Sequence, residues 1–207
     1  VLIIAMAVLV GSRAAVEYAE SRQYTEPLFV FVIMVVAASR PILDVVRRGV
    51  VSVAELVPGR AAVTRVWLGL AVVPILGSFI TEPAAMTLAA LLLAPQIFRQ
   101  GIPERLKYAA LGVLFVNVSI GGTLTSYAAP PVLMVASVWN WDTAFMARTF
   151  GLSAGIAVLV NASAVTFLLR NHVAAAEPAP QPSVPIPLLV SAVHLAFLAA
   201  VVVFAHQ

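Results

Sequence analysis

The sequence has no cysteine, only three histidines and few charged residues, which make up 10% of its 207 positions. The absence of cysteine excludes disulfide bonds, zinc–thiolate sites and iron–sulfur clusters. The chain also lacks an HExxH zinc-binding pair, a GxSxG nucleophile turn and a phosphate-binding loop. We therefore expect neither an enzyme nor a bound cofactor.

Long apolar runs dominate the sequence, and hydrophobic residues make up 62% of the chain. Several runs approach the roughly 20 residues that a helix needs to cross a bilayer. The arginines gather between the runs, which places those segments in the cytoplasm and explains the net charge of +3 better than nucleic-acid binding does. We expect an all-α, multi-pass protein of the bacterial inner membrane.

The two ends of the sequence suggest an incomplete set of spans. The chain starts at Val1 with an apolar run half a span long and stops shortly after a full apolar run. We interpret residues 1–173 as a first transmembrane repeat with a truncated start and residues 174–187 as a Pro-rich cytoplasmic linker. Residues 188–207 would be the first helix of a missing second repeat, and a homodimer is left open.

Residues 66–98 contain a single charged side chain, Glu82, between basic flanks. One helix of this length would measure roughly 50 Å, too long for one span, whereas two comfortable spans need about 40 residues. Because both flanks are basic, both ends of the segment belong on the cytoplasmic side. The pattern predicts a re-entrant hairpin that enters and leaves the membrane by the same face.

The hairpin is expected to turn near the middle of the membrane. Residues 66–76 would descend roughly 17 Å as a half-helix, and residues 77–82, which open with Gly77, would form the turn. A second half-helix would start at Pro83, with Thr81 as its N-cap.

Residues 108–138 carry no formal charge and are interrupted at their centre. Gly121 and Gly122 would end one half-helix, Pro130 and Pro131 would start another, and the backbone between them would be unwound. Unwound backbone at bilayer depth is tolerated only when it is buried in protein or lines a polar cavity. We therefore predict a broken helix, and two interrupted elements close in sequence are typical of transporters with ion sites near the midplane.

Two flanking segments are expected to set the orientation. An apolar run begins at Pro27 and should continue as a helix to Asp44, where Arg40 could pair with Asp44 at the cytoplasmic rim. Residues 42–60 would form a short interfacial helix. The tryptophan-rich residues 139–142 mark the opposite interface.

Glu82 is the only carboxylate within the two interrupted segments. An acidic side chain inside a membrane indicates function by default. Sodium binding would favour the charged carboxylate, and protonation would neutralise it and release the ion, which is proton/cation exchange. The alternative is an exposed turn between two short spans, in which Glu82 is merely solvated.

Hydroxyl and amide groups gather at the two breaks, and hard cations such as Na⁺ prefer oxygen ligands. Ser119 and Thr87 also lie near the breaks but are not placed in the ligand set. A bound Na⁺ is expected to contact Glu82, Thr81 and Thr125. The full predicted ion-binding and proton-carrying set is Glu82, Thr81, Ser78, Thr123, Thr125, Ser126 and Asn117.

The sequence resembles the sodium/proton antiporter family of the ion transporter superfamily, which also includes arsenite permeases and sodium-coupled carboxylate carriers. The resemblance spans nearly the whole chain. It is carried by GSFITEPAAMT at residues 77–87, EPLFVFVIMVVAASRPIL at residues 26–43 and GGTLTSYAAPPVLM at residues 121–134. The last motif is similar to a Gly-Gly-x-Leu-Thr-Pro-x-Gly stretch of arsenite permeases, with Ser126 in place of Pro and Ala128 in place of Gly.

The resemblance implies two inverted repeats, each with a re-entrant hairpin and a broken helix, around a shared site. Hairpin tips in the superfamily are usually rich in Asn, Ser or Thr, whereas this one offers Thr81 and Glu82, a departure that favours a cation site. Two alternatives stay open, an anion permease of the same architecture, binding an oxyanion or a carboxylate, and a membrane scaffold that transports nothing.

Overall fold

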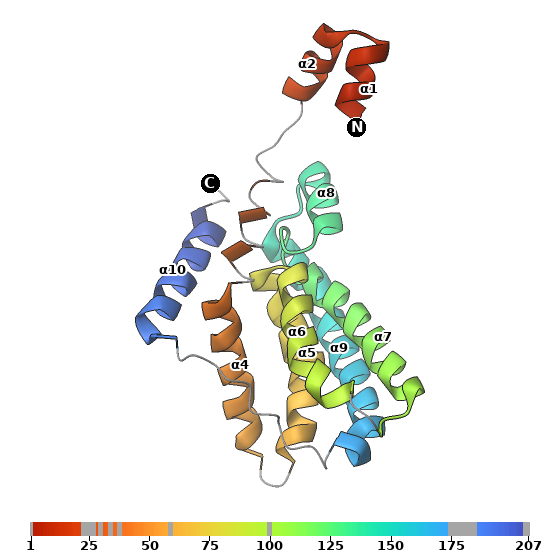
Figure 1. The fold of residues 1–207 in the computed structure, drawn as a ribbon, viewed down its shortest axis with the longest axis vertical. Coiled ribbons are helices and arrows are strands. Elements are labelled where there is room, and N and C mark those ends of the chain that lie inside the picture. The colour runs from red at the N-terminus through yellow and green to blue at the C-terminus, as the bar shows by residue number, and fades with distance from the viewer. Residues whose placement is uncertain are drawn as a thin grey trace. The chain divides into compact units, whose positions relative to one another are not determined.

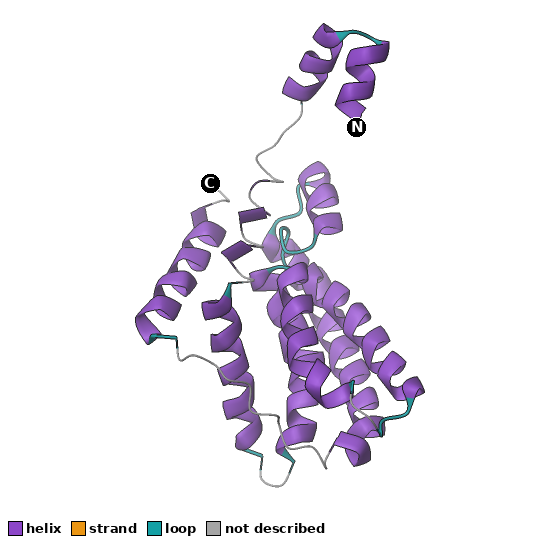
Figure 2. Ribbon diagram, viewed as in Figure 1, coloured by secondary structure: helices purple, strands orange, loops and turns teal. Residues whose placement is uncertain are grey.

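The computed structural model describes residues 2–21, 28, 31–32, 35–36, 39–57, 60–98, 101–173 and 186–204. These residues form helices and loops, with no strand among them (Figure 2). Within this described part, three helices are long and apolar enough to cross a membrane, at Ala61–Ile80, Glu104–Leu124 and Thr143–Val173. The predicted all-α, multi-pass membrane fold is confirmed.

The chain forms two compact units, residues 1–32 and residues 33–207. The first unit contains α1 (Leu2–Leu9), which is wholly apolar, and α2 (Ser12–Glu20). The chain turns between them at Gly11, whose φ of 111° is a conformation that glycine adopts readily. The two helices pack against each other.

The second unit is a helical bundle in which α5, α6, α7 and α9 run side by side (Figure 1). Its core contains fully buried aliphatic side chains such as Leu70, Leu88, Val118 and Val158. Within a bilayer, such side chains hold helices together by van der Waals packing, since lipid tails are as apolar as the side chains themselves. The helices are α4 (Arg40–Glu55), α5 (Ala61–Ile80), α6 (Glu82–Ile97), α7 (Glu104–Gly121), the 3₁₀ turn η1 (Gly122–Leu124), α8 (Pro130–Trp139), α9 (Thr143–Val173) and α10 (Leu188–Phe204).

Helix α4 begins later than the sequence suggests. The expected helix from Pro27 to Asp44 is interrupted at Ser39, which has an extended backbone and precedes Pro41 in the first turn of α4; most of residues 27–38 lie outside the described residues. Asp44 pairs with Arg47 at 2.9 Å and with Arg48 at 2.5 Å, not with Arg40. The predicted pair of Arg40 with Asp44 is therefore wrong. The carboxylate pairs instead with arginines three and four positions after it in the helix.

Helices α5 and α6 form a helical hairpin in the segment predicted to be re-entrant, but its turn is much shorter than expected. Helix α5 starts at Ala61 rather than at residue 66 and continues to Ile80, so Gly77 is helical and only Thr81 separates α5 from α6. The 15 residues from Val66 to Ile80 rise roughly 22 Å after Arg65. The tip thus lies farther from the basic flank than the predicted 17 Å.

The helical segment is interrupted where the sequence places the break. Helix α7 ends at Gly121, η1 begins at Gly122, residues 125–129 are non-helical, and α8 begins with Pro130 and Pro131. The two glycines and two prolines therefore end and start these helices as predicted.

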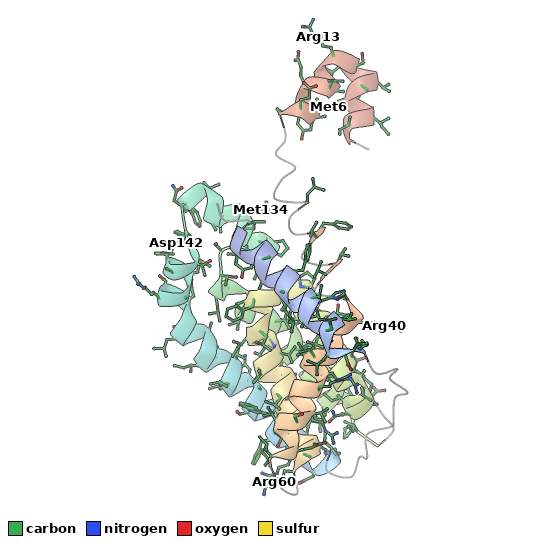
Figure 3. The ribbon with its side chains drawn as sticks, turned by 90° about the vertical axis from the view of Figure 1, so that its left-hand side faces the viewer. Met6, Arg13, Arg40, Arg60, Met134 and Asp142 are labelled. Carbon is green, nitrogen blue, oxygen red and sulfur yellow. The ribbon has the colours of Figure 1, made fainter. Side chains whose placement is uncertain are left out.

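The turn between α8 and α9 carries an aromatic cluster. The ring centroids of Trp139 and Trp141 are 4.8 Å apart, and those of Trp141 and Phe145 are 5.2 Å apart. Arg60 lies at the opposite end of this unit from Asp142 (Figure 3). This polarity agrees with a basic cytoplasmic end and an aromatic far end. The predicted linker falls largely on residues 174–185, outside the described residues.

Candidate ion-binding site

The tip of the α5–α6 hairpin and the break after α7 meet, and we call this meeting point, residues 77–82 and 121–129, the crossing. Three hydrogen bonds join the two segments. The Glu82 backbone N–H donates to the Ala128 carbonyl at 3.0 Å. Ser78 Oγ donates to the Gly121 carbonyl, and Thr125 Oγ1 donates to the Ser78 carbonyl at 2.8 Å.

These bonds satisfy main-chain groups that helix ends leave unpaired. In a continuous helix the Ser78 carbonyl would accept from the Glu82 N–H, since the two are four residues apart. At the crossing each of these groups bonds to the broken segment instead. Buried backbone groups without partners cost free energy, so each interruption stabilises the other.

The reversal of the chain at Thr81 requires an unusual backbone. Its φ is 87° and its ψ is 150°, a conformation that is rare for a β-branched residue and costs of order 1–3 kcal/mol. The Thr81 N–H still donates to the Gly77 carbonyl at 2.8 Å and so closes the last turn of α5. Strain of this kind persists only where the surrounding contacts hold it, as the three cross-bonds do here.

Close packing at the crossing depends on two glycines. A Cβ on Gly121 would lie 2.2 Å from the Pro74 carbonyl oxygen of α5, and a Cβ on Gly77 would lie 2.9 Å from Ala85 Cβ of α6. Both distances are below any real contact. The glycines that the sequence marks as structural thus permit the close approach of α5 to α7 and to α6.

Glu82 lies in the first turn of α6 and is part-buried. Ser119 of α7 donates its hydroxyl to Glu82 Oε1 at 2.8 Å. The second oxygen, Oε2, makes no hydrogen bond within the described part of the chain and would lie 3.9 Å from a Cβ placed on Gly122. The positive end of the α6 dipole also favours a negative charge at this position.

Thr81 occupies the N-cap position of α6 as predicted, but its side chain makes no capping hydrogen bond. The residue is 1% exposed, and Oγ1 has no hydrogen-bond partner among the described residues. A buried hydroxyl without a partner costs about 1–3 kcal/mol. Thr81 Oγ1, adjacent in sequence to Glu82, is therefore an oxygen atom that bonds to no described residue and that a cation could contact.

The other predicted ligands have different surroundings. Thr123 Oγ1 donates to the Ile120 carbonyl of its own turn at 2.7 Å. Ser126 Oγ lies 3.2 Å from Thr143 Oγ1 at the start of α9. Asn117 is fully buried one turn before Gly121 and bonds to α5 and α9.

The crossing thus brings together Glu82, Ser78 and Thr125, with Thr81 beside Glu82 in the chain, while Thr123, Ser126 and Asn117 bond elsewhere. Ser119 was outside the predicted ligand set although it contacts Glu82 directly. Its position two residues before Gly121 was the available signal, since it places the hydroxyl in the last turn of α7. The described residues contain no group of three or more His, Cys, Asp or Glu side chains that could hold a metal ion. The side-chain oxygens that accompany Glu82 at the crossing are neutral hydroxyls.

The bundle has three candidate spans, and two interrupted elements meet around a carboxylate. These features define a class of protein, the polytopic membrane proteins with the broken-helix sites typical of secondary transporters. The comparison with protein families agrees with this class. The family described as "Putative Na+/H+ antiporter" matches residues 1–207, and the chain belongs to that family. No curated protein and no solved structure matches the chain.

Proposed function

We propose that this protein exchanges protons for Na⁺ or a similar monovalent cation across a bacterial inner membrane, with Glu82 as the group that carries either ion. Family membership supports sodium/proton antiport in general. The observation that carries the specific proposal is the position of Glu82 at the crossing, where Oε1 accepts from Ser119. Thr81 Oγ1, next in the chain, is buried and unpaired among the described residues.

The exchange follows from the charge of one side chain. A carboxylate at membrane depth is costly without a compensating charge, so it is occupied by a cation or neutralised by a proton. A proton removes the charge that attracts the cation, and a cation occupies the oxygens that would take the proton. The two ions therefore exclude each other at Glu82, as an exchanger requires.

The neutral oxygens of the crossing support a small hard cation. Glu82 Oε2 and Thr81 Oγ1 have no partner in the part of the chain that the structure describes. The Thr125 hydroxyl already donates to the Ser78 carbonyl, but its oxygen can still accept a cation through a lone pair. The predicted contacts of Na⁺ with Glu82, Thr81 and Thr125 remain part of this proposal.

An oxyanion would meet the Glu82 carboxylate at the α6 N-terminus, where the positive helix end would otherwise attract it. Like-charge repulsion thus disfavours the anion permease. A non-transporting scaffold would leave the buried Thr81 hydroxyl and its strained backbone without a role.

Reconstitution in sealed vesicles tests the proposal. An inward Na⁺ gradient should drive proton efflux through the wild-type protein, and Glu82→Gln, which keeps the shape but removes the charge, should reduce efflux to that of empty vesicles. The matched control is Glu104→Gln, in the exposed first turn of α7, which should retain efflux within about twofold. Sodium-driven efflux that survives Glu82→Gln overturns the assignment, and uptake of an oxyanion instead of Na⁺ overturns antiport.

A further inference from the structure

Helix α5 has a proline, Pro74, inside its helical run. Proline has no N–H, so the carbonyl of the residue four positions earlier, Leu70, loses its donor within the helix. Leu70 has no exposed surface, so water cannot replace the missing hydrogen bond. The Leu70 carbonyl therefore needs a donor from elsewhere in the bundle.

Asn117 of α7 supplies that donor. Its Nδ2 donates to the Leu70 carbonyl at 2.8 Å and to the Val158 carbonyl of α9 at 3.2 Å. Its Oδ1 accepts from Asn161 Nδ2 at 3.1 Å. The amide is fully buried, both of its N–H groups are used, and its oxygen accepts from Asn161 of α9, so its orientation is fixed by α5 and α9.

Two residues that follow Asn117 on α7 connect this contact to the crossing. Gly121, one turn later, lies against the Pro74 carbonyl and accepts from Ser78 Oγ. Ser119, between Asn117 and Gly121, donates to Glu82. Helix α7 is thus held against α5 on both sides of Ser119.

We infer that Asn117 is a positioning residue and not an ion ligand. It replaces the main-chain donor that Pro74 lacks and thereby holds the last turns of α7 where Ser119 reaches the Glu82 carboxylate. This role at the site rests on the proposed antiport at Glu82, whereas the contact with the proline kink can be tested without transport.

A double-mutant cycle tests the contact. Asn117→Leu should lower the melting temperature of the detergent-solubilised protein by roughly 5 °C, because it leaves the Leu70 carbonyl buried and unpaired. Pro74→Ala restores the N–H within α5, so in that background Asn117→Leu should lower the melting temperature by less than half as much. The matched control is Pro95→Ala in α6, a proline inside another helix, which should leave the effect of Asn117→Leu unchanged. Equal losses in the wild-type and Pro74→Ala backgrounds overturn the inference.

Transport measurements distinguish a positioning role of Asn117 from a role as an ion ligand. If Asn117 positions α7, Pro74→Ala should restore at least half of the maximal exchange rate lost in Asn117→Leu, and the half-saturating Na⁺ concentration should stay within about twofold of wild type. A ligand role would instead raise the half-saturating Na⁺ concentration about tenfold or more in both backgrounds, which would overturn the inference. If wild-type protein shows no exchange, the proposed function fails, and the melting-temperature cycle still decides the role of Asn117.

Discussion

The hydroxyl groups at the crossing have the same chemistry but bond to different partners. Thr125 is buried and links the break to α5 through the Ser78 carbonyl. Thr123, two residues earlier, bonds to its own turn. The Thr123 bond to the Ile120 carbonyl is local and half-buried, whereas the Thr125 bond is buried and joins residues 47 apart. Loss of the Thr123 hydroxyl would thus remove only a local, half-buried bond, whereas loss of the Thr125 hydroxyl would leave the Ser78 carbonyl without this donor in a buried site.

We therefore expect Thr125→Val to destabilise the protein by about 1–3 kcal/mol, because the Ser78 carbonyl would remain buried without a donor. Thr123→Val, the same change two residues away, should cost less than about 0.5 kcal/mol. Thermal unfolding of the two variants in detergent measures the difference. Equal losses of stability would show that the cross-bond from Thr125 contributes nothing specific.

At the scale of single residues, the sequence was sufficient to single out Glu82. A lone carboxylate within a long apolar segment is visible in the pattern itself. The partners of the hydroxyls were not predictable, because serine and threonine in membrane helices bond to their own turn or to a neighbouring helix with similar ease. Only the fold distinguishes Thr125 and Ser119, which contact the hairpin, from Thr123, which does not.

At the scale of helices, the close approach of α7 to α5 depends on the missing side chain at Gly121. We expect Gly121→Ala to destabilise the protein by about 3 kcal/mol or more, because its methyl group would overlap the Pro74 carbonyl, and backbone cannot move aside as a side chain can. Gly112 lies in the same helix, and a methyl group there would have no neighbouring atom within 4 Å. Gly112→Ala should stabilise by up to about 1 kcal/mol through helix propensity. Circular dichroism during denaturation measures the stability of both variants. A Gly121→Ala variant as stable as Gly112→Ala would contradict this explanation.

Helix α4 lies outside the candidate spans and contains a charge cluster that should respond to pH. Hydrogen bonds from Arg47 and Arg48 lower the pKa of Asp44 below its ordinary value of 3.8, against an opposing effect of burial. A carboxyl group whose pKa is lower in the folded state stabilises the protein above its unfolded pKa and loses that contribution as the pH falls through the folded value.

Asp44→Asn should therefore lower the melting temperature at pH 7, and the difference from wild type should shrink as the pH falls below about 4. Melting curves at pH values of about 7, 5 and 2.5 extend well below the ordinary value of 3.8, where this change takes place. The control is Glu17→Gln in the exposed pair with Arg13, where the difference should be small at every pH. A gap between wild type and Asp44→Asn that stays constant across these pH values would refute the role of the ion pairs.

The helices themselves were predicted unevenly from the sequence. The end of α7 and the start of α8 were predictable, because paired glycines and paired prolines mark them directly. The end of α5 was not, since Gly77 and Ser78 look like turn residues. In the fold Gly77 instead packs against Ala85, and the chain reverses within Thr81 alone. A one-residue reversal held by hydrogen bonds to a distant segment has no local sequence signal.

At the scale of the whole molecule, Arg60, just before α5, and Asp142, just before α9, lie at opposite ends of the second unit (Figure 3). Helix α6 has 16 residues and rises roughly 24 Å from the tip to its end at Ile97. Together with the rise of roughly 22 Å along α5 after Arg65, this places the tip short of the roughly 30 Å thickness of a hydrocarbon core. Counted from Ala61, however, α5 is long enough to cross a membrane, so the re-entrant course of the hairpin, with Glu82 inside the membrane, stays a prediction.

Cysteine labelling tests this topology without background, because the chain has no cysteine of its own. In intact cells, a membrane-impermeant thiol reagent should label Ala144→Cys, at the exposed start of α9, and should leave Arg60→Cys unlabelled until the membrane is opened. Phe79→Cys, at a tip position that is 57% exposed in the isolated chain, should resist the reagent from outside, because the tip does not reach that surface. If Phe79→Cys reacts from outside as fast as Ala144→Cys, then α5 and α6 cross the membrane separately. Glu82 would then face the external solution, where water would stabilise its charge and no ion would be needed to neutralise it.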